Sequence, residues 1–167
     1  MRFYSLLLVL VTILLFSACG GSSFIGTGGS SSKERESSTA SIYFEDAKWE
    51  QIQGMATKEL KPIFLDFYTD WCAPCRWLEQ DAFQTEIAAR YFNKNLVSKK
   101  VNAEKGEGID LAQEHHIKAY PTVIFLRPNG TELSRHVGMT SASNLVYMAK
   151  KAVQQLEVER LAAEKKK

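Results

Sequence analysis

Residues 71–75 read Trp-Cys-Ala-Pro-Cys, and the sequence on either side of them decides the fold. Upstream, residues 63–68 (IFLDFY) are almost continuously apolar, which is typical of a central strand covered on both faces of its sheet. Downstream, residues 76–93 have a mostly helical pattern with a break near Phe83 and a restart at Thr85. A buried strand, a Cys-x-x-Cys turn and a helix therefore follow one another directly.

The remaining pattern predicts further helices and strands in an α/β layer architecture. Asp46 is predicted to cap the first helix, and a Pro-Asn-Gly turn at residues 128–130 is predicted to connect the last two strands as a hairpin. We expect helices over residues 46–59, 109–115 and 141–156, and strands over residues 96–102, 122–126 and 132–137.

Composition indicates a globular protein with one packed domain. Its 167 residues are 45% hydrophobic and 11% aromatic, which is enough for one core and too few for two ordinary domains. A formal net charge of +2 provides no basic excess, so we expect no nucleic-acid partner. Three cysteines are too few for a small domain held together mainly by disulfides.

The first 18 residues are expected to be a signal peptide. Arg2 precedes an apolar stretch over residues 6–16, which is shorter than the roughly 20 residues that a membrane-spanning helix needs. Cys19 then follows two small residues, an arrangement that resembles the lipobox of bacterial lipoproteins, although Phe16 stands where that motif usually has Leu. The resemblance implies cleavage before Cys19 and lipidation of its thiol. The alternative is an uncleaved anchor with an incidental cysteine.

Residues 19–40 are expected to form the lipidated cysteine and a flexible linker. Positions 20–40 contain five Gly and seven Ser, a composition that cannot bury a core. The folded domain is therefore assigned to residues 41–167.

The Cys-x-x-Cys motif and four other features resemble the thioredoxin family. Asp66 lies six residues before Cys72, as the buried aspartate of that family does, and Lys100 matches the lysine beside that aspartate. Residues 120–122 match the family's cis-proline segment, and residues 137–138 match the end of its last strand. The resemblance covers residues 44–156. It implies a thioredoxin fold, in which a central mixed β-sheet is flanked by helices on both faces.

One departure and two segments refine this resemblance. Gln80 stands where thioredoxin itself has a helix-kinking proline. Residues 78–83 and 102–108 are more similar to the C-terminal domain of DsbD-type thiol:disulfide interchange proteins and to periplasmic thioredoxin-like lipoproteins.

The two cysteines of the motif are the candidate reacting groups. At the start of a helix, Cys72 would lie at the exposed N-terminal rim, where backbone N–H groups and the helix dipole favour a thiolate. We therefore expect Cys72 to be the nucleophile and Cys75 the resolving thiol of a redox-active disulfide. The alternatives are a structural disulfide and half of a metal site.

Other cofactor chemistry has little support in the sequence. A zinc site needs four ligands, and His115 and His116 are adjacent, so they cannot share a helix face. Covalent haem attachment needs a histidine directly after the second cysteine, where Arg76 stands. We therefore expect neither a metal nor a cofactor.

Asp66 is a carboxyl group within a hydrophobic strand, where burial is costly and raises the pKa. The resemblance implies that Asp66 is the general base for Cys75, acting through water, and that Lys100 modulates its charge. The alternatives are that Asp66 points to solvent at a strand edge and that Lys100 lies on an exposed strand face.

The substrate-binding residues are expected beside the nucleophile. The resemblance implies a cis peptide before Pro121, which would bring Tyr120 next to Cys72 and present backbone groups to an extended substrate. Trp71 belongs either to the core or to the rim of the site, and its position next to Cys72 favours the rim.

The direction of electron flow is inferred from residues 73–74. Ala-Pro provides no histidine to stabilise the thiolate, which corresponds to a more reducing couple. We expect a protein-disulfide reductase in the bacterial cell envelope, lipid-anchored to the membrane and facing the periplasm or exterior. It would act on protein or peptide disulfides with electrons from a DsbD-like membrane donor. The alternatives are a disulfide oxidase or isomerase, and a module that binds clients without turnover.

Overall fold

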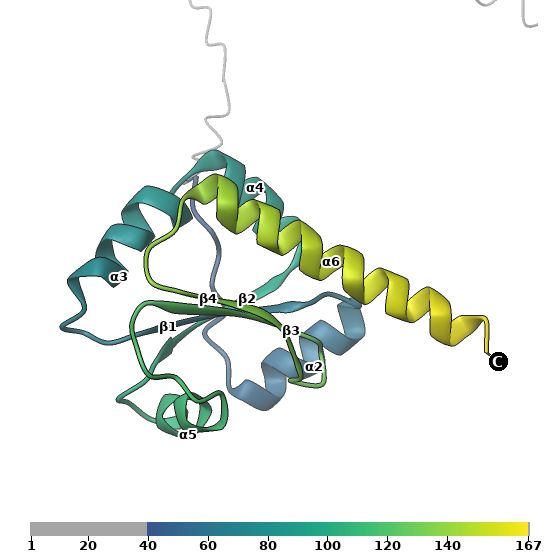
Figure 1. The fold of residues 1–167 in the computed structure, drawn as a ribbon. Helices are drawn as coiled ribbons and strands as arrows, with labels where there is room; N and C mark the ends of the chain where they lie inside the picture. Colours follow the sequence, from purple (N-terminus) through teal and green to yellow (C-terminus); the bar gives the residue numbers. More distant parts are fainter. Residues whose placement is uncertain (1–39, 167) are drawn as a thin grey trace, which may run out of the picture. The chain divides into compact units, whose positions relative to one another are not determined.

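Four strands form one mixed sheet in the computed structural model, which describes residues 40–166 (Figure 1). The order across the sheet is β2-β1-β3-β4, so the central position predicted for the apolar strand is confirmed. β1 pairs in parallel with β2 and antiparallel with β3, and β3 pairs antiparallel with β4. The strands are β1 (Ile63–Tyr68), β2 (Val97–Asn102), β3 (Thr122–Leu126) and β4 (Glu132–Val137).

Helices cover both faces of the sheet, as Figure 1 shows, with α4 and α6 on one face and α2 and α5 on the other. This is the thioredoxin-like layer arrangement expected from the sequence. The helical segments are α2 (Trp49–Glu59), α3 (Ala73–Leu78), a π-helical turn (Glu79–Phe83), α4 (Glu86–Asn95), α5 (Glu107–Glu114) and α6 (Ala142–Glu164).

The alternating side chains of β1 divide the core into two clusters. Phe64 packs in the cluster beneath α3, α4 and α6, whereas Leu65 and Phe67 pack beneath α2 and α5. Successive side chains of a strand point to opposite faces, so Asp66 points to the same face as Phe64. The sheet therefore directs the one carboxyl group of β1 toward the layer that contains α3.

The predicted N-terminal features lie outside the described residues. These are the signal peptide (1–18), Cys19 and all of the predicted linker except Ala40. Within residues 40–166, we find no helix that combines the length and the apolar character needed to cross a bilayer.

The start of α2 differs from the prediction. Asp46 does not cap it, because the helix begins three residues later, at Trp49. The Lys48 N–H donates to Gln51 Oε1 at 3.0 Å, and the Trp49 N–H donates to Glu107 Oε2 at 3.0 Å. The cap thus includes a carboxylate from α5, which a local sequence pattern does not reveal.

The predicted interruption between α3 and α4 is confirmed. The π-helical turn ends at Phe83, and Thr85 is the N-cap of α4, with its hydroxyl near the Ala88 N–H at 3.4 Å. A π-helical turn is a common cause of a helix kink. The break therefore occurs here although residue 80 is Gln and not Pro.

Two further helix boundaries differ from expectation, and a long-range contact accounts for the one in α6. α5 begins at Glu107, two residues before the predicted start, and α6 continues to Glu164, eight residues past the predicted apolar stripe. Arg127, in the turn of the hairpin, donates to both carboxylate oxygens of Glu159 at 2.8 and 2.7 Å. This two-bond ion pair fastens the C-terminal part of α6 to the hairpin.

Candidate active site

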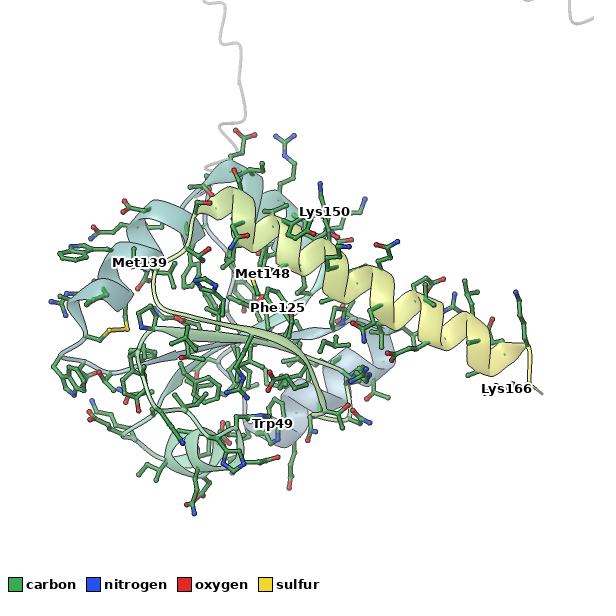
Figure 2. All side chains as sticks on the ribbon, viewed as in Figure 1. Trp49, Phe125, Met139, Met148, Lys150 and Lys166 are labelled. Atoms are coloured by element: carbon green, nitrogen blue, oxygen red, sulfur yellow. A yellow bond between two sulfur atoms is a disulfide. The ribbon has the colours of Figure 1, made fainter. Side chains whose placement is uncertain are left out.

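A disulfide joins Cys72 and Cys75 at the start of α3 (Figure 2). Cys72 is the N-cap of α3, and its Sγ accepts a hydrogen bond from the Cys75 N–H at 3.1 Å. Pro74 lies in the first turn, where its missing N–H costs no helical hydrogen bond. The backbone therefore directs positive electrostatic potential at the sulfur of Cys72.

The expected exposure of Cys72 is wrong for this disulfide form. Cys72 is 2% exposed and Cys75 is 7% exposed, so neither residue lies open at the rim. The disulfide holds the Cys72 sulfur back against the first turn of α3, where the Cys75 N–H meets it. Exposure therefore does not distinguish the two cysteines, and their chemical difference comes from the position of Cys72 at the helix terminus.

Asp66 is buried in the middle of the sheet, at 2% exposure, so the alternative that it faces solvent is wrong. Its Oδ1 has no hydrogen-bond partner among the described residues. Burial raises the pKa of Asp66 to about 7; the positive charge of Lys100 opposes this increase, and the negative charge of Glu79 adds to it. A carboxyl group with this pKa exchanges protons near neutral pH.

Lys100 lies beside Asp66 but binds a different carboxylate. The two residues are paired in the register of β1 and β2, as the resemblance implied. The Lys100 ammonium, however, donates to Glu79 Oε2 at 2.6 Å, and the Lys100 side chain is 27% exposed. Lys100 is therefore partly buried between the two acidic groups, and the alternative of a freely exposed strand lysine is wrong.

Glu79 is a site residue that the sequence analysis missed. It follows Cys75 by four residues, a spacing that places both on one face of a helix. That spacing was an available signal, but only the tertiary pairing with Lys100 distinguishes Glu79 from its exposed acidic neighbours.

A pocket of about 220 Å³ connects these groups. Asp66 and Cys75 both line it, so the two residues border the same space. A pocket of this size has room for water between polar groups. Its remaining lining residues are Tyr68, Asp70, Arg76, Glu79 and Lys100.

Two of the predicted substrate-binding residues, Trp71 next to Cys72 in the chain and Tyr120, are in contact. The peptide between Tyr120 and Pro121 is cis, as the resemblance implied. The Tyr120 and Trp71 rings form an edge contact with 6.0 Å between centroids, and Trp71 is 67% exposed, so Trp71 belongs to the rim. The Gly138 N–H, at the end of β4, donates to the Pro121 carbonyl at 2.8 Å. The loop before β3 is thus held against the hairpin.

Trp71 is held from its other side by Glu104, whose carboxylate accepts the indole N–H at 3.0 and 3.1 Å. In the part of the chain that the structure describes, no three His, Cys, Asp or Glu side chains converge as metal ligands. The groups that do converge are two cysteine sulfurs, a proton-exchanging carboxyl group and an aromatic rim. This combination is chemically suited to thiol–disulfide exchange.

Comparison with known proteins identifies relatives of the domain. The family model described as thioredoxin matches residues 42–151. Thioredoxin-T of Drosophila melanogaster is 31% identical over 100 residues, which are 60% of each chain. The thiol:disulfide interchange protein DsbD of Campylobacter jejuni is 31% identical over 99 residues, which are 59% of this chain and 17% of DsbD. The chain thus spans less than two thirds of the length of either relative.

A solved structure of a putative disulphide-isomerase from Bacteroides thetaiotaomicron is also similar. It superposes with a TM-score of 0.60 and 34% identity, over 68% of this chain and 93% of that one.

Proposed function

Because the chain belongs to the thioredoxin family, we propose that it is a thiol–disulfide oxidoreductase that reduces protein disulfides while tethered to a membrane outside the cytoplasm. The observation that carries this proposal is the position of the Cys72–Cys75 disulfide, at the start of α3 and beside the pocket that contains Asp66. The similarity to DsbD and to a disulphide-isomerase supports the same class of chemistry.

In the first step, the Cys72 thiolate of the reduced protein attacks one sulfur of a client disulfide. A bond forms between Cys72 and that sulfur, the client S–S bond breaks, and the second client sulfur leaves as a thiolate. The Cys75 N–H and the start of α3 stabilise the Cys72 thiolate. Trp71, Tyr120 and the backbone beside Pro121 hold the client segment.

In the second step, Cys75 resolves the mixed disulfide. The Asp66 carboxylate accepts the Cys75 thiol proton through water in the shared pocket, and the Cys75 thiolate attacks the Cys72 sulfur. The mixed disulfide breaks, the second client thiolate leaves, and the Cys72–Cys75 disulfide forms. Two electrons pass to the client, and a dithiol donor must return two electrons before the next cycle.

The reducing direction is proposed from the surroundings of Cys72. Within residues 40–166, the hydrogen bond that its sulfur accepts comes from a backbone N–H and not from a charged side chain. Residues 73–74 contain no histidine. A thiolate with modest stabilisation corresponds to a low reduction potential, because a strongly stabilised reduced form makes an oxidant.

The membrane tether is proposed from the sequence of residues 1–40. The apolar segment, the lipobox-like residues before Cys19 and the Gly/Ser-rich linker together favour a lipoprotein with a mobile domain. A DsbD-like membrane reductase is the proposed electron donor. The tether is tested by replacing Cys19 with Ala, which should leave an uncleaved or mislocalised precursor. An unmodified, soluble wild-type protein that begins at Cys19 would contradict it.

The roles of the two cysteines are tested by single substitutions in the full chain. Cys72→Ser should abolish insulin reduction. Cys75→Ser should still attack a client disulfide and then remain covalently attached to it, so that mass spectrometry detects the adduct and identifies the client. If Cys72→Ser formed adducts and Cys75→Ser formed none, the roles of nucleophile and resolving thiol would be exchanged.

The direction of electron flow is tested by equilibrating the Cys72–Cys75 pair with glutathione. We expect a reduction potential close to that of thioredoxin, about −270 mV, and far from that of DsbA, about −120 mV. A value above about −170 mV on this scale would favour the oxidase or isomerase alternative. Client binding without any insulin reduction would instead favour the binding module.

A further inference from the structure

A groove of about 690 Å³ lies between α4 and α6, and the proposed redox chemistry does not use it. Its apolar floor is formed by Ile87 and Tyr91 of α4 and Val146 of α6. Ile87 is 55% exposed although it lies at the start of a packed helix. The groove therefore presents apolar surface to the outside of the domain.

Cationic side chains surround this floor. Arg90, Lys94 and Lys150 line the groove, with Glu86 as its one acidic lining residue, so the lining carries a formal charge of +2. Glu86 pairs with Arg90. Lys94 and Lys150 form no ion pair with any residue in 40–166, and Lys150 Nζ lies 5.7 Å from the centroid of the Tyr91 ring. Two ammonium groups thus remain available beside an apolar surface.

The N-terminal end of the described chain is fastened to the same helix. The Tyr43 N–H donates to Asn93 Oδ1 at 2.7 Å, and Asn93 Nδ2 donates to the Ser41 carbonyl at 3.1 Å. Asn93 belongs to α4, between the groove residues Tyr91 and Lys94. The segment that precedes Ser41 therefore joins the domain at the helix that forms the groove.

We propose that this groove binds the headgroups of anionic phospholipids and so docks the domain on the membrane surface. Lys94 and Lys150 would contact phosphate groups, and Ile87 would enter the boundary between headgroups and acyl chains. The charge of the rim, the exposed isoleucine and the position of the chain entry all favour an anionic membrane over a neutral ligand. The proposal rests on the proposed tether for the nearby membrane, but the contacts belong to α4 and α6 alone.

Docking through this groove would leave the redox site accessible. Figure 2 shows Lys150 on α6 well separated from the disulfide at the start of α3. A membrane against α4 and α6 would therefore not cover Trp71 and Tyr120, which form the rim of that site.

The test uses the full chain in nanodiscs of phosphatidylcholine alone and in nanodiscs with about 30% phosphatidylglycerol. Hydrogen–deuterium exchange of residues 86–95 and 146–150 is compared between the two compositions. We expect protection only with the anionic lipid, and its loss at about 0.5 M salt because salt screens these contacts. Equal exchange in both compositions would overturn the proposal.

A charge-reversal pair provides the matched control. Lys94→Glu with Lys150→Glu should weaken binding to the anionic lipid at least about 30-fold, because each lost lysine costs about fivefold and each added carboxylate is repelled by the anionic surface. Lys58→Glu with Lys118→Glu makes the same change in net charge at exposed positions away from the groove and should have little effect. Equal weakening by both pairs would overturn the groove assignment.

The outcomes separate the groove from the tether. A chain that leaves phosphatidylcholine discs but is protected by anionic ones would contradict the tether and support the groove. Protection by a soluble acidic peptide, with none by anionic lipid, would overturn the lipid assignment in favour of a protein partner.

Discussion

Lys100 donates to Glu79 at 2.6 Å, although the strand register pairs Lys100 with Asp66. The positive charge that would otherwise stabilise the Asp66 carboxylate is thus shared with a second acid. Burial and Glu79 raise the Asp66 pKa, and Lys100 alone opposes them, so the pKa lies at about 7. A general base is most effective when its pKa lies close to the working pH.

Glu79→Gln should therefore lower the pKa of Asp66 for two reasons. It removes a nearby negative charge, and it removes the carboxylate that competes with Asp66 for the positive charge of Lys100. Infrared or NMR titration of the Asp66 carboxyl group in the full chain measures this change. Glu86→Gln, which alters an exposed carboxylate paired with Arg90, is the control and should leave the pKa of Asp66 unchanged. An unchanged Asp66 titration in Glu79→Gln would contradict the electrostatic account.

Asp66→Asn should stabilise the protein above neutral pH and not at acidic pH. The folded-state pKa is about 7 against an ordinary value of 3.8, so the folded state binds more protons between these values and wild-type stability falls as pH rises. At about 1.4 kcal/mol per pH unit, the wild type loses up to about 4 kcal/mol across this window, which the amide avoids. Denaturant unfolding of the wild type and Asp66→Asn at about pH 4 and pH 8 measures the difference in their unfolding free energies. An equal difference at both pH values would refute the prediction.

The same substitution should slow resolution of the mixed disulfide. Loss of a general base typically costs about 10²–10⁴-fold, and the defect should shrink above neutral pH, where hydroxide forms the Cys75 thiolate unaided. Single-turnover reduction of a model disulfide from about pH 5 to pH 9 should show an inflection near the Asp66 pKa in the wild type and none in Asp66→Asn. Superimposable profiles would leave Asp66 without a role as base.

Gly108→Ala should destabilise the fold, whereas Gly54→Ala should not. A Cβ at Gly108, in α5, would overlap the Asn102 carbonyl oxygen at the end of β2, and a clash of this kind costs about 1–3 kcal/mol. Nothing lies within 4 Å of a Cβ at Gly54, in α2, where Ala should add about 0.5–1 kcal/mol of stability. Thermal unfolding of both variants provides the comparison, and equal shifts would contradict the close approach at Gly108.

Local signals were sufficient for much of this fold. The apolar run of β1, the Pro-Asn-Gly turn of the hairpin and the Thr85 restart each depend on neighbouring residues, and the structure contains all three. The two cysteines followed from the Cys-x-x-Cys motif itself, whereas Asp66, Lys100 and the segment before Pro121 were assigned through the resemblance to the thioredoxin family. The structure brings Asp66 and Cys75 to one pocket, in keeping with that resemblance.

Features that depend on distant partners could not be predicted in this way. The cap of α2 includes Glu107, 58 residues away, and the extension of α6 depends on an Arg127–Glu159 pair that is 32 residues apart. Glu79, in the π-helical turn, gains its place in the site only through Lys100 on β2. In each case a charged side chain takes its role from a tertiary neighbour, and the local pattern is that of an ordinary surface residue.

The hydrogen bonds that fasten residues 41–43 determine how the domain would respond to pulling. Tension in the preceding chain would reach Asn93 through Ser41 and Tyr43, and would reach Phe83 through the Ile42 N–H, which donates to the Phe83 carbonyl at 2.9 Å. Phe83 ends the helical segment whose other end carries the disulfide. A mechanical load on the N-terminal segment would therefore be applied to the scaffold of the cysteines before it reached the sheet.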